Sequence, residues 1–582
     1  MAKSGNEALK EASNYLRGTI LEGLANSATG SLSGDDQKLT KFHGTYQQDD
    51  RDLRRERRKK KLEPVYSFMI RVRAPGGTAT PTQWLEMDRL AHEYSNGALK
   101  ITTRQTFQLH GVIKSNLKRT IFEINQALYD TLAACGDVNR NVICNPNPAQ
   151  SQVRAEVSEL AKRISNHLLP RSGAYYDIWI GDASGEQVKV TQDAPLVGES
   201  ADEVEPIYGK YYLPRKFKIA IAVPPSNDVD IYAHDLGFLA ILDDSQTKIL
   251  GYNVTVGGGM GMTHGNEATF PRLADEMGFC LPEQVLAVAE SVLRVQRDHG
   301  NREDRANARL KYTVERMGLA AFRAEVEALC GHALESARPF RFESNGDTYG
   351  WTEDHLGNWH YGLYIENGRV CDQPDYPLMT GLREIAKVHE GEFWMTTNQN
   401  LIIAKVTPAA KPRIEAMLKE YGMFESVNRS ALRLHSMSCV ALPSCGLALA
   451  EAQRFLPDVV GRLEKVLEGA GLRHDAITIR MTGCPNGCAR PYIAEIAFVG
   501  KGPDTYNIYL GAGFAGDRLN KLYRTAVKGG EIETVLRPVL LDYAANRLPG
   551  ERFGDFTVRA GYVKATEHGR DFHKDVVEGV SA

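Results

Sequence analysis

Residues 99–110 read Leu99-Lys-Ile-Thr-Thr-Arg-Gln-Thr-Phe-Gln-Leu-His110, and residues 393–404 read Phe393-Trp-Met-Thr-Thr-Asn-Gln-Asn-Leu-Ile-Ile-Ala404. Each stretch is predicted to be a β-strand, and each follows a predicted helix that ends at a glycine, Gly97 or Gly391. Along the first stretch, alternation would place one row of polar side chains on a single face of the strand. That row comprises Lys100, Thr102, Arg104, Thr106, Gln108 and His110.

The two stretches belong to a longer correspondence within the 582-residue chain. The two glycines are 294 residues apart, and so are Gln105 and Gln399, while Cys144 and Cys439 are 295 residues apart. A nearly common offset across three features predicts an internal duplication whose period is far too long for a solenoid. We therefore expect an α+β fold with mixed and antiparallel sheets, two halves around a pseudo-twofold axis, and ligands at the domain junction.

Composition restricts the cellular setting. The formal net charge is −3, with 42% hydrophobic and 25% charged residues, as in an ordinary globular protein. No apolar run approaches the ~20 residues of a membrane span, and residues 1–30 lack the apolar stretch of a signal peptide. The nine cysteines are odd in number and too few for a disulfide scaffold. We expect a cytoplasmic protein with reduced thiols and no membrane partner.

Residues 1–62 are predicted to be an N-terminal arm. Within it, residues 51–61 carry eight basic and two acidic side chains. Such a run is found in arms that bind nucleic acid or a protein partner, and also in solvated helical faces or linkers. The rest of the chain has neither an aromatic-rich RNA-binding strand nor zinc-finger spacing, so we expect no nucleic-acid partner.

Four of the cysteines lie within 50 residues of one another. Cys439 and Cys445 are separated by five residues, and Cys484 and Cys488 by three. Four thiolates can hold a [4Fe-4S] cluster or a tetrahedral zinc ion, and buried cysteines can also be plain hydrophobic residues. The first pair is wide for a zinc knuckle, and glycines around the second pair let the backbone approach an inorganic cluster. The spacing favours the cluster and leaves the other two interpretations open.

Several cations have no obvious acidic partner in the sequence. Residues 212–223 are predicted to be a strand, on which Lys216 and Lys218 would lie side by side and repel each other unless an anion lies between them. An exposed strand end is the alternative interpretation. Together with Arg71, Lys100, Arg104 and Arg140, these lysines suggest one or more polyanionic ligands. The run Gly257–Gly261 fails the dinucleotide fingerprint and no phosphate loop occurs, so no NADPH or flavin site is evident.

The paired cysteine motifs, Ser-Cys439-Val-Ala-Leu-Pro-Ser-Cys445-Gly and Thr-Gly-Cys484-Pro-Asn-Gly-Cys488-Ala-Arg-Pro, resemble those of the sirohaem sulfite and nitrite reductases. The resemblance runs over most of the chain, to Gly554-Asp-Phe-Thr-Val-Arg-Ala-Gly561. Two N-terminal stretches, Asn14-Tyr-Leu-Arg-Gly-Thr-Ile20 and Phe42-His-Gly-Thr-Tyr-Gln-Gln-Asp-Asp-Arg51, resemble in particular the haemoprotein β-components of bacterial NADPH-dependent assimilatory enzymes.

The resemblance implies cofactors and roles for individual residues. One [4Fe-4S] cluster would be held by Cys439, Cys445, Cys484 and Cys488, and the thiolate of Cys488 would bridge it to the iron of one sirohaem. The side chains implied to contact the macrocycle are Lys100, Arg104, Arg215 and Gln399. Those implied to hold sulfite during its six-electron reduction to sulfide are Arg71, Arg140, Lys216 and Lys218. NADPH, FAD and FMN would belong to a separate flavoprotein α subunit in a hetero-oligomer, with the N-terminal arm as a docking candidate.

The resemblance also implies a division of the chain after the arm. Residues 63–135 and 346–425 would be ferredoxin-like half-repeats, residues 136–345 a first sirohaem- and substrate-binding domain, and residues 426–582 a second domain that carries the cysteines. The alternative within the family is a ferredoxin-dependent sulfite or nitrite reductase with the same cofactors. The alternative from a different class is a zinc-stabilised protein whose basic arm binds nucleic acid.

Overall fold

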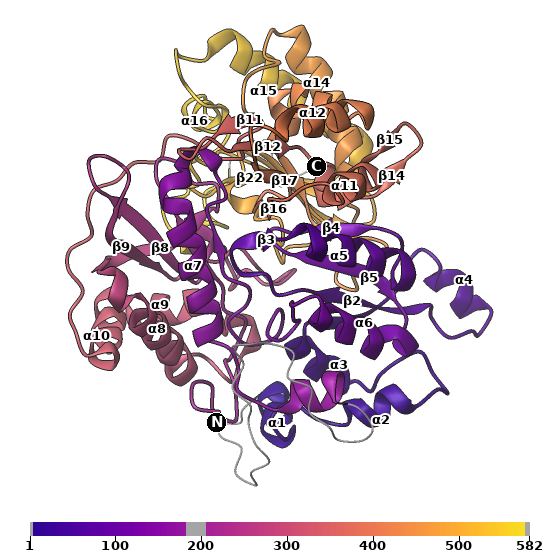
Figure 1. Cartoon of the computed structure of the whole chain (residues 1–582). Coiled ribbons are helices and arrows are strands. Elements are labelled where there is room, and N and C mark those ends of the chain that lie inside the picture. The colour runs from indigo at the N-terminus through magenta and orange to yellow at the C-terminus, as the bar shows by residue number, and fades with distance from the viewer. Residues whose placement is uncertain (1–3, 182–204, 577–582) are drawn as a thin grey trace.

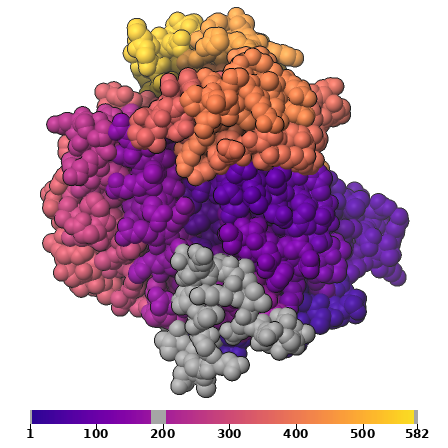
Figure 2. Space-filling model, in the orientation of Figure 1, coloured from indigo at the N-terminus to yellow at the C-terminus, as the bar shows by residue number. Residues whose placement is uncertain are grey.

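The computed structural model describes residues 4–181 and 205–576 (Figure 1). Within them, two five-stranded antiparallel sheets and two five-stranded mixed sheets repeat the same plan in each half of the chain. The predicted α+β duplication is therefore confirmed. In the orientation of Figure 2, the orange to yellow surface of the C-terminal part of the chain lies above the indigo to purple surface of the N-terminal part.

The two antiparallel sheets have equivalent strand orders. The first has the order β1 (Thr45–Asp49), β2 (Tyr66–Arg71), β5 (Phe107–Val112), β4 (Leu99–Ile101) and β13 (Arg369–Val370). The second has the order β11 (Gly350–Glu353), β12 (Trp359–Leu363), β17 (Leu401–Val406), β16 (Glu392–Met395) and β3 (Thr78–Ala79). Each sheet thus receives its last strand from the other half of the chain, and this exchange joins the halves.

A glycine precedes each exchanged strand. A Cβ on Gly77 would lie 2.7 Å from the Cβ of Gln105, and one on Gly368 would lie 2.8 Å from the Cβ of Gln399. Both glycines have a positive φ, 71° and 67°, which side chains with a Cβ rarely adopt. The two crossings therefore need glycine for the same steric reason.

The two mixed sheets also match strand for strand. The first has the order β10 (Asp275–Cys280), β9 (Ile249–Val256), β8 (Leu236–Leu242), β7 (Ile219–Ala222) and β6 (Ile143–Cys144). The second has the order β22 (Lys521–Lys528), β21 (Thr505–Leu510), β20 (Ile496–Gly502), β19 (Ile479–Thr482) and β18 (Ser436–Ser438). In each sheet the last three strands named are parallel and the other pairings are antiparallel.

Helices accompany the sheets in matching pairs. The antiparallel sheets are accompanied by α5 (Pro81–Tyr94), α6 (Lys114–Gln126), α11 (Leu378–Ala386) and α12 (Lys411–Glu420). The mixed sheets are accompanied by α7 (Ser151–His167), α8 (Val285–His299), α14 (Leu456–Gly469) and α15 (Ile532–Asn546). Thr80 and Gln83 form a reciprocal capping box at the start of α5. Arg383 of α11 donates to Asp88 of α5 at 2.5 Å, so an ion pair links the two halves.

The two stretches predicted to be continuous strands are hairpins instead. Residues 102–106 turn between β4 and β5, and residues 396–400 turn between β16 and β17. Gln105 and Gln399, with φ of 49° and 71°, occupy the left-handed position of each turn. Threonine favours strands, and glutamine gives no signal for a positive φ, so alternation suggested a strand. The predicted strand at 212–223 likewise shortens to β7, and Lys216 and Lys218 lie in the loop before it.

The N-terminal segment is a smaller appendage than expected. Four leucines and isoleucines of residues 4–49 are buried in the main hydrophobic core, and β1 pairs with β2. These four side chains are Leu16, Ile20, Leu32 and Leu39. Only residues 50–62 stand out, and they include the short basic helix α4 (Arg54–Lys59), at the right edge of Figure 1. Because residues 4–49 pack against the core and the first sheet, residues 1–62 as a whole are not a detached arm.

Candidate functional site

The four clustered cysteines lie at one edge of the second mixed sheet. Cys439 follows β18 and Cys484 follows β19, and the two strands are parallel neighbours whose carboxyl ends meet. The backbone amide of Gly483 donates to Sγ of Cys439 at 3.3 Å, and the side-chain amide of Asn486 donates to Sγ of Cys484 at 3.4 Å. Donors aimed at sulfur stabilise thiolates, as iron–sulfur ligation requires.

The four thiols influence one another, and Cys488 is their common neighbour. Burial raises the pKa of Cys439, Cys445 and Cys484, that of Cys484 to about 11, and the next cause in each case is the charge of Cys488. Cys488 itself is exposed, whereas Cys484 is buried and the other two are half-buried. In the described parts of the chain, no three Cys, His, Asp or Glu side chains converge on a single metal ion. Four thiols gathered at one edge of a sheet are a donor set that a [4Fe-4S] cluster or a tetrahedral zinc ion can take.

A recess of cations adjoins these thiols. Lys216 and Lys218 are half-buried, and within residues 4–181 and 205–576 neither ammonium has a hydrogen bond or a carboxylate within 4.0 Å. Burial, and then the charge of Arg140, lower the pKa of Lys216 to about 7. Burial, and then the charge of Lys216, hold the pKa of Lys218 well below its usual range. Burying uncompensated charge of this kind costs free energy unless an anionic ligand binds there.

Arg71 and Arg140 lie near this recess without a carboxylate of their own. Nη1 of Arg71 lies 2.9 Å from Sγ of Cys135. The side-chain amide of Gln108 is assigned the orientation that satisfies both its oxygen and its nitrogen. In this orientation, the amide oxygen accepts from Nε (2.6 Å) and Nη2 (2.5 Å) of Arg71. Arg140 donates to the carbonyl of Gly136 at 3.2 Å. Neutral acceptors orient both guanidinium groups and leave their charge for an anion.

The residues implied to contact a macrocycle are also deficient in acidic partners. Burial lowers the pKa of Lys100 to about 7, that of Arg104 to about 9 and that of Arg215 to about 10. Lys100 donates to Oε1 of Gln453 at 2.7 Å, and Arg104 to the carbonyl of Ile219 at 2.9 Å. Arg215 reaches a carboxylate, that of Asp137, only at 4.0 Å.

Unsatisfied polar atoms support the same conclusion. Nε of Arg104 and Oε1 of Gln399 are buried and have no hydrogen-bond partner. By contrast, Gln105, the counterpart of Gln399, donates to the carbonyl of Cys144 at 2.7 Å and accepts from its amide at 2.8 Å. A carboxylate of a ligand such as the sirohaem that the resemblance implies could accept from Nε of Arg104, whereas the amide oxygen of Gln399 is itself an acceptor and needs a donor.

The thiols and the cations form adjoining sites rather than separate ones. The charge of Cys488 acts on Lys216, and that of Cys439 acts on Lys100. Oγ1 of Thr103, in the first hairpin turn, donates to the carbonyl of Cys488 at 3.2 Å. The structure thus gathers the twelve residues singled out in the sequence around the junction of the two halves.

Sequence reasoning missed the ion pairs that hold this junction. Arg490 donates to Asp230 at 2.5 Å and to the carbonyls of Thr103 (3.2 Å) and Thr397 (3.1 Å), so it ties both hairpin turns to the loop after Cys488. Arg480 also pairs with Asp230, at 2.8 Å. Arg490 lies two residues after Cys488 in the second cysteine motif, and this closeness is the sequence feature that could have pointed to it. Asp230 lies 260 residues away and gave none.

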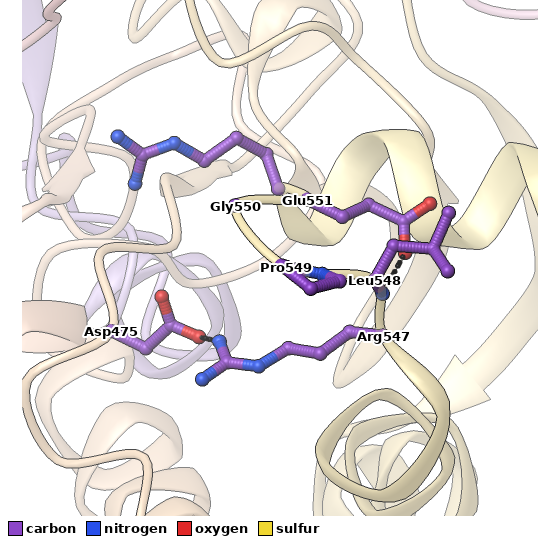
Figure 3. A pocket seen from close by; sticks show the side chains of 7 residues that line it. Asp475, Arg547, Leu548, Pro549, Gly550 and Glu551 are labelled. Carbon is purple, nitrogen blue, oxygen red and sulfur yellow. Dashed lines mark hydrogen bonds and ion pairs between the residues drawn. The ribbon is translucent and has the colours of Figure 1, made fainter.

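A hollow of about 430 Å³ lies elsewhere, between α15 and α16 (Phe553–Arg559). It is lined by Asp475 and residues 547–552, and Figure 3 shows Asp475 paired with Arg547. None of these residues belongs to the sites above. In the part of the chain that the structure describes, no helix is long and apolar enough to cross a membrane.

Comparison with known proteins gives consistent matches. Residues 158–334 match the family described as "Nitrite and sulphite reductase 4Fe-4S domain", and residues 60–127 and 352–421 match the "Nitrite/Sulfite reductase ferredoxin-like half domain". The four clustered cysteines lie outside these matched ranges. The two half-domain matches each contain one of the hairpin turns.

Curated relatives match over nearly the whole chain. The chain is 58% identical over 567 residues to "Sulfite reductase [NADPH] hemoprotein beta-component" of Anoxybacillus flavithermus, covering 97% of each protein. It is 58% identical over 573 residues to the protein of the same name from Methylobacterium nodulans, covering 98% of this chain and 93% of the relative. The solved structure of Mycobacterium tuberculosis NirA protein matches with a TM-score of 0.75 at 24% identity, covering 97% of each chain, and supports the fold.

Proposed function

This chain belongs to the nitrite and sulphite reductase family, and we propose that within it the chain catalyses the six-electron reduction of sulfite to sulfide. The observation that carries the proposal is the set of four clustered thiols, one of which, Cys488, influences both the other three thiols and Lys216 through its charge. The relatives named "Sulfite reductase [NADPH] hemoprotein beta-component" favour sulfite as the substrate and a partner component that uses NADPH, which we propose to be a flavoprotein.

The chain's residues fit two resident cofactors. Cys439, Cys445, Cys484 and Cys488 would hold a [4Fe-4S] cluster, and Cys488 would also reach the iron of sirohaem. Lys100, Arg104, Arg215 and Gln399 would bind the macrocycle. When bound, these groups would supply one-electron transfer to sulfite.

The remaining chemistry belongs to side chains of the recess. Sulfite loses three oxygens as water, which requires six protons as well as six electrons. Arg71 and Arg140 would hold the oxygens and stabilise negative charge, because their guanidinium groups are already oriented by neutral acceptors. Lys216, whose pKa is near 7, can donate a proton at neutral pH and be protonated again.

Cofactor analysis of the purified protein tests this proposal. Protein expressed in a host that makes sirohaem should absorb strongly in the visible and contain about five iron and about four acid-labile sulfide atoms per chain. It should turn over sulfite with a reduced viologen as electron donor. A colourless protein that contains zinc and no acid-labile sulfide would contradict the proposal.

The partner surface is proposed at the basic segment formed by residues 50–62. Arg51 ties this segment to the cysteine loop, because its Nη1 donates to the carbonyls of Ala448 (2.6 Å) and Cys445 (3.2 Å). Leu447, beside Cys445, is 68% exposed. A flavoprotein with an acidic face could dock on the basic segment while its electron donor approaches the thinly covered cysteine loop.

Charge reversal on the basic segment tests this docking. Arg55, Arg58 and Lys59 are exposed and have no ion pair among the described residues. The triple variant R55E/R58E/K59E should raise the KM for the flavoprotein about tenfold or more and weaken its salt dependence. Viologen-driven turnover should stay unchanged.

A matched control reverses charge on another surface. K162E/R163E, on the exposed side of α7, should leave both activities unaltered. An unchanged KM for the flavoprotein in the triple variant would show that the flavoprotein docks on another surface. Deletion of residues 1–60 would be a poor test, because it also removes buried core residues.

A further inference from the structure

The Cys488 loop, formed by residues 484–490, has a counterpart in the first half of the chain. β19 pairs with β20 in the same register as β7 with β8, at an offset of 260 residues. The same offset relates Arg490 to Asp230, and both have a positive φ, 51° and 53°. It also relates Cys488 to Asp228. The counterpart loop therefore carries a carboxylate where the Cys488 loop carries its exposed thiol.

Each hairpin turn holds one of these two loops by an equivalent hydrogen bond. Oγ1 of Thr103, in the turn between β4 and β5, donates to the carbonyl of Cys488 at 3.2 Å. Thr397 lies 294 residues later, in the turn between β16 and β17, and its Oγ1 donates to the carbonyl of Asp228. The two threonines are thus a matched pair, in which Thr103 holds the Cys488 loop and Thr397 holds its counterpart.

Arg490 joins both turns to the Cys488 loop from inside the junction. Its guanidinium donates to the carbonyls of Thr103 (3.2 Å) and Thr397 (3.1 Å) and to the carboxylate of Asp230 (2.5 Å). Nη1 of Arg480 donates to the carbonyl of Arg490 at 3.1 Å and pairs with Asp230 at 2.8 Å. The backbone of the loop is therefore held at residue 488 by a threonine and at residue 490 by buried charged side chains.

Asp230 provides the negative charge of this buried group. The side chains of Arg480, Asp230 and Arg490 are 3%, 1% and 4% exposed, and the one carboxylate accepts from both guanidinium groups. Left-handed backbone is unfavourable for a residue with a Cβ, so the conformation of Arg490 needs such contacts to persist. Without Asp230, two buried cations would lack a counter-charge. The position of the Cys488 loop thus depends on a carboxylate from the other half of the chain.

We propose that Thr103 and Asp230 are positioning residues for Cys488, Thr103 through the carbonyl of Cys488 and Asp230 through Arg490. Together they fix the exposed thiol relative to the two hairpin turns, which carry residues implied to contact the macrocycle. A ligand shared by two metal centres tolerates little displacement, so the loop that carries it must be held from several sides. That the thiol is shared rests on the proposed function, whereas the holding of the loop does not.

Hydrogen–deuterium exchange, measured by mass spectrometry on the purified full chain, tests the holding of the loop. The reporter is the amide of Arg490, which donates to the carbonyl of Gly487 at 3.0 Å. T103V removes the hydroxyl and keeps the branched shape, and it should make this amide exchange about threefold to tenfold faster, the size of one hydrogen bond. D230N leaves two arginines without a counter-charge and should make it exchange about tenfold faster or more.

The duplication supplies a matched control. T397V loses the equivalent hydrogen bond on the counterpart loop and should leave exchange at Arg490 within about twofold of the wild type. T103S keeps a hydroxyl and should restore the exchange that T103V alters. D88N breaks the ion pair of Asp88 with Arg383, which also links the two halves, and should not alter exchange at Arg490 either.

Two results would overturn the proposal. One is exchange at Arg490 that is equally fast in T103V, T397V and the wild type. The other is a rise in D230N that spreads evenly over the whole protein, because that pattern shows a loss of stability alone. If D230N does not fold, T103V, at a half-buried position, still gives the first comparison.

The protein loaded with its cofactors gives a second measurement. In T103V, the electron paramagnetic resonance signal of coupling between the two metal centres should weaken, and T397V should keep the wild-type signal. In T103V, kcat should fall about tenfold while the KM for sulfite stays within about threefold, because the anion-binding side chains are unchanged. Wild-type coupling in T103V protein whose loop exchanges faster would overturn the role of Thr103 in positioning Cys488.

Failure of the proposed function has a different signature. Wild-type protein that takes up no sirohaem would contradict the function. The exchange comparison needs no cofactor, so it would still decide whether Thr103 and Asp230 hold the Cys488 loop.

Discussion

Replacing Cys488 with serine should abolish sulfite turnover and remove most of the visible absorption. Cys488 is the exposed member of the four thiols and the one whose charge acts on all three others and on Lys216. Serine is a much weaker ligand for iron than a thiolate, so the cluster should lose a ligand and its link to sirohaem. We expect at least about a 10³-fold loss of activity with viologen as donor, since no other side chain can replace the bridge.

The comparison with two other cysteines makes this test specific. Cys445→Ser should also impair the cluster, but any sirohaem that remains should keep a cysteine at its iron. Cys330→Ser is the control, because its Sγ donates only to backbone carbonyls of Glu327 and His332, which a hydroxyl can also do. Electron paramagnetic resonance reports the coupling between the two metal centres. Wild-type spectra and turnover in the Cys488→Ser protein would remove Cys488 from the bridge.

Replacing Lys216 with methionine should lower kcat/KM for sulfite about 10²- to 10³-fold while both cofactors remain bound. Methionine has a similar length but neither charge nor proton, so the variant loses attraction for the anion and a proton donor together. K216R separates the two contributions, because arginine keeps the charge and does not release its proton. It should hold sulfite within about threefold of the wild-type affinity but turn over slowly. Lys248→Met, at an exposed position, is the control.

The same lysine gives a pH dependence with a defined sign. Its pKa is lowered to about 7 in the ligand-free protein, so the free recess loses this charge as pH rises through 7. Sulfite binding favours the protonated form and should therefore take up a proton and weaken above pH 7, by at most about tenfold per pH unit for one proton. K216M should lack this dependence. An equal slope in the wild type and K216M, measured by calorimetry in buffers of different ionisation enthalpy, would assign the proton to another group.

Local sequence patterns explain some of the structure and fail at identifiable places. The repeat offset led to the duplicated sheets because equivalent elements keep equivalent spacing. The turns at Gln105 and Gln399 were missed because a positive φ in glutamine is imposed by hydrogen bonds within the hairpin, such as that from its amide to Thr102 or Thr396. The packing of residues 4–49 was missed because the burial of Leu16, Ile20 and Leu32 depends on contacts with residues far along the chain, which their own spacing does not show.

The sequence by itself determined which chemistry this chain can carry: four cysteines at a restrictive spacing, an excess of arginine and lysine, and a repeated architecture. Each of these features can be recognised in the sequence without knowledge of the fold. Only the tertiary structure decided which cations lack a counter-charge. Asp230 and Arg490, for example, come together although 260 residues of chain separate them. Charge balance in a buried site depends on all such neighbours at once, and no local pattern encodes that sum.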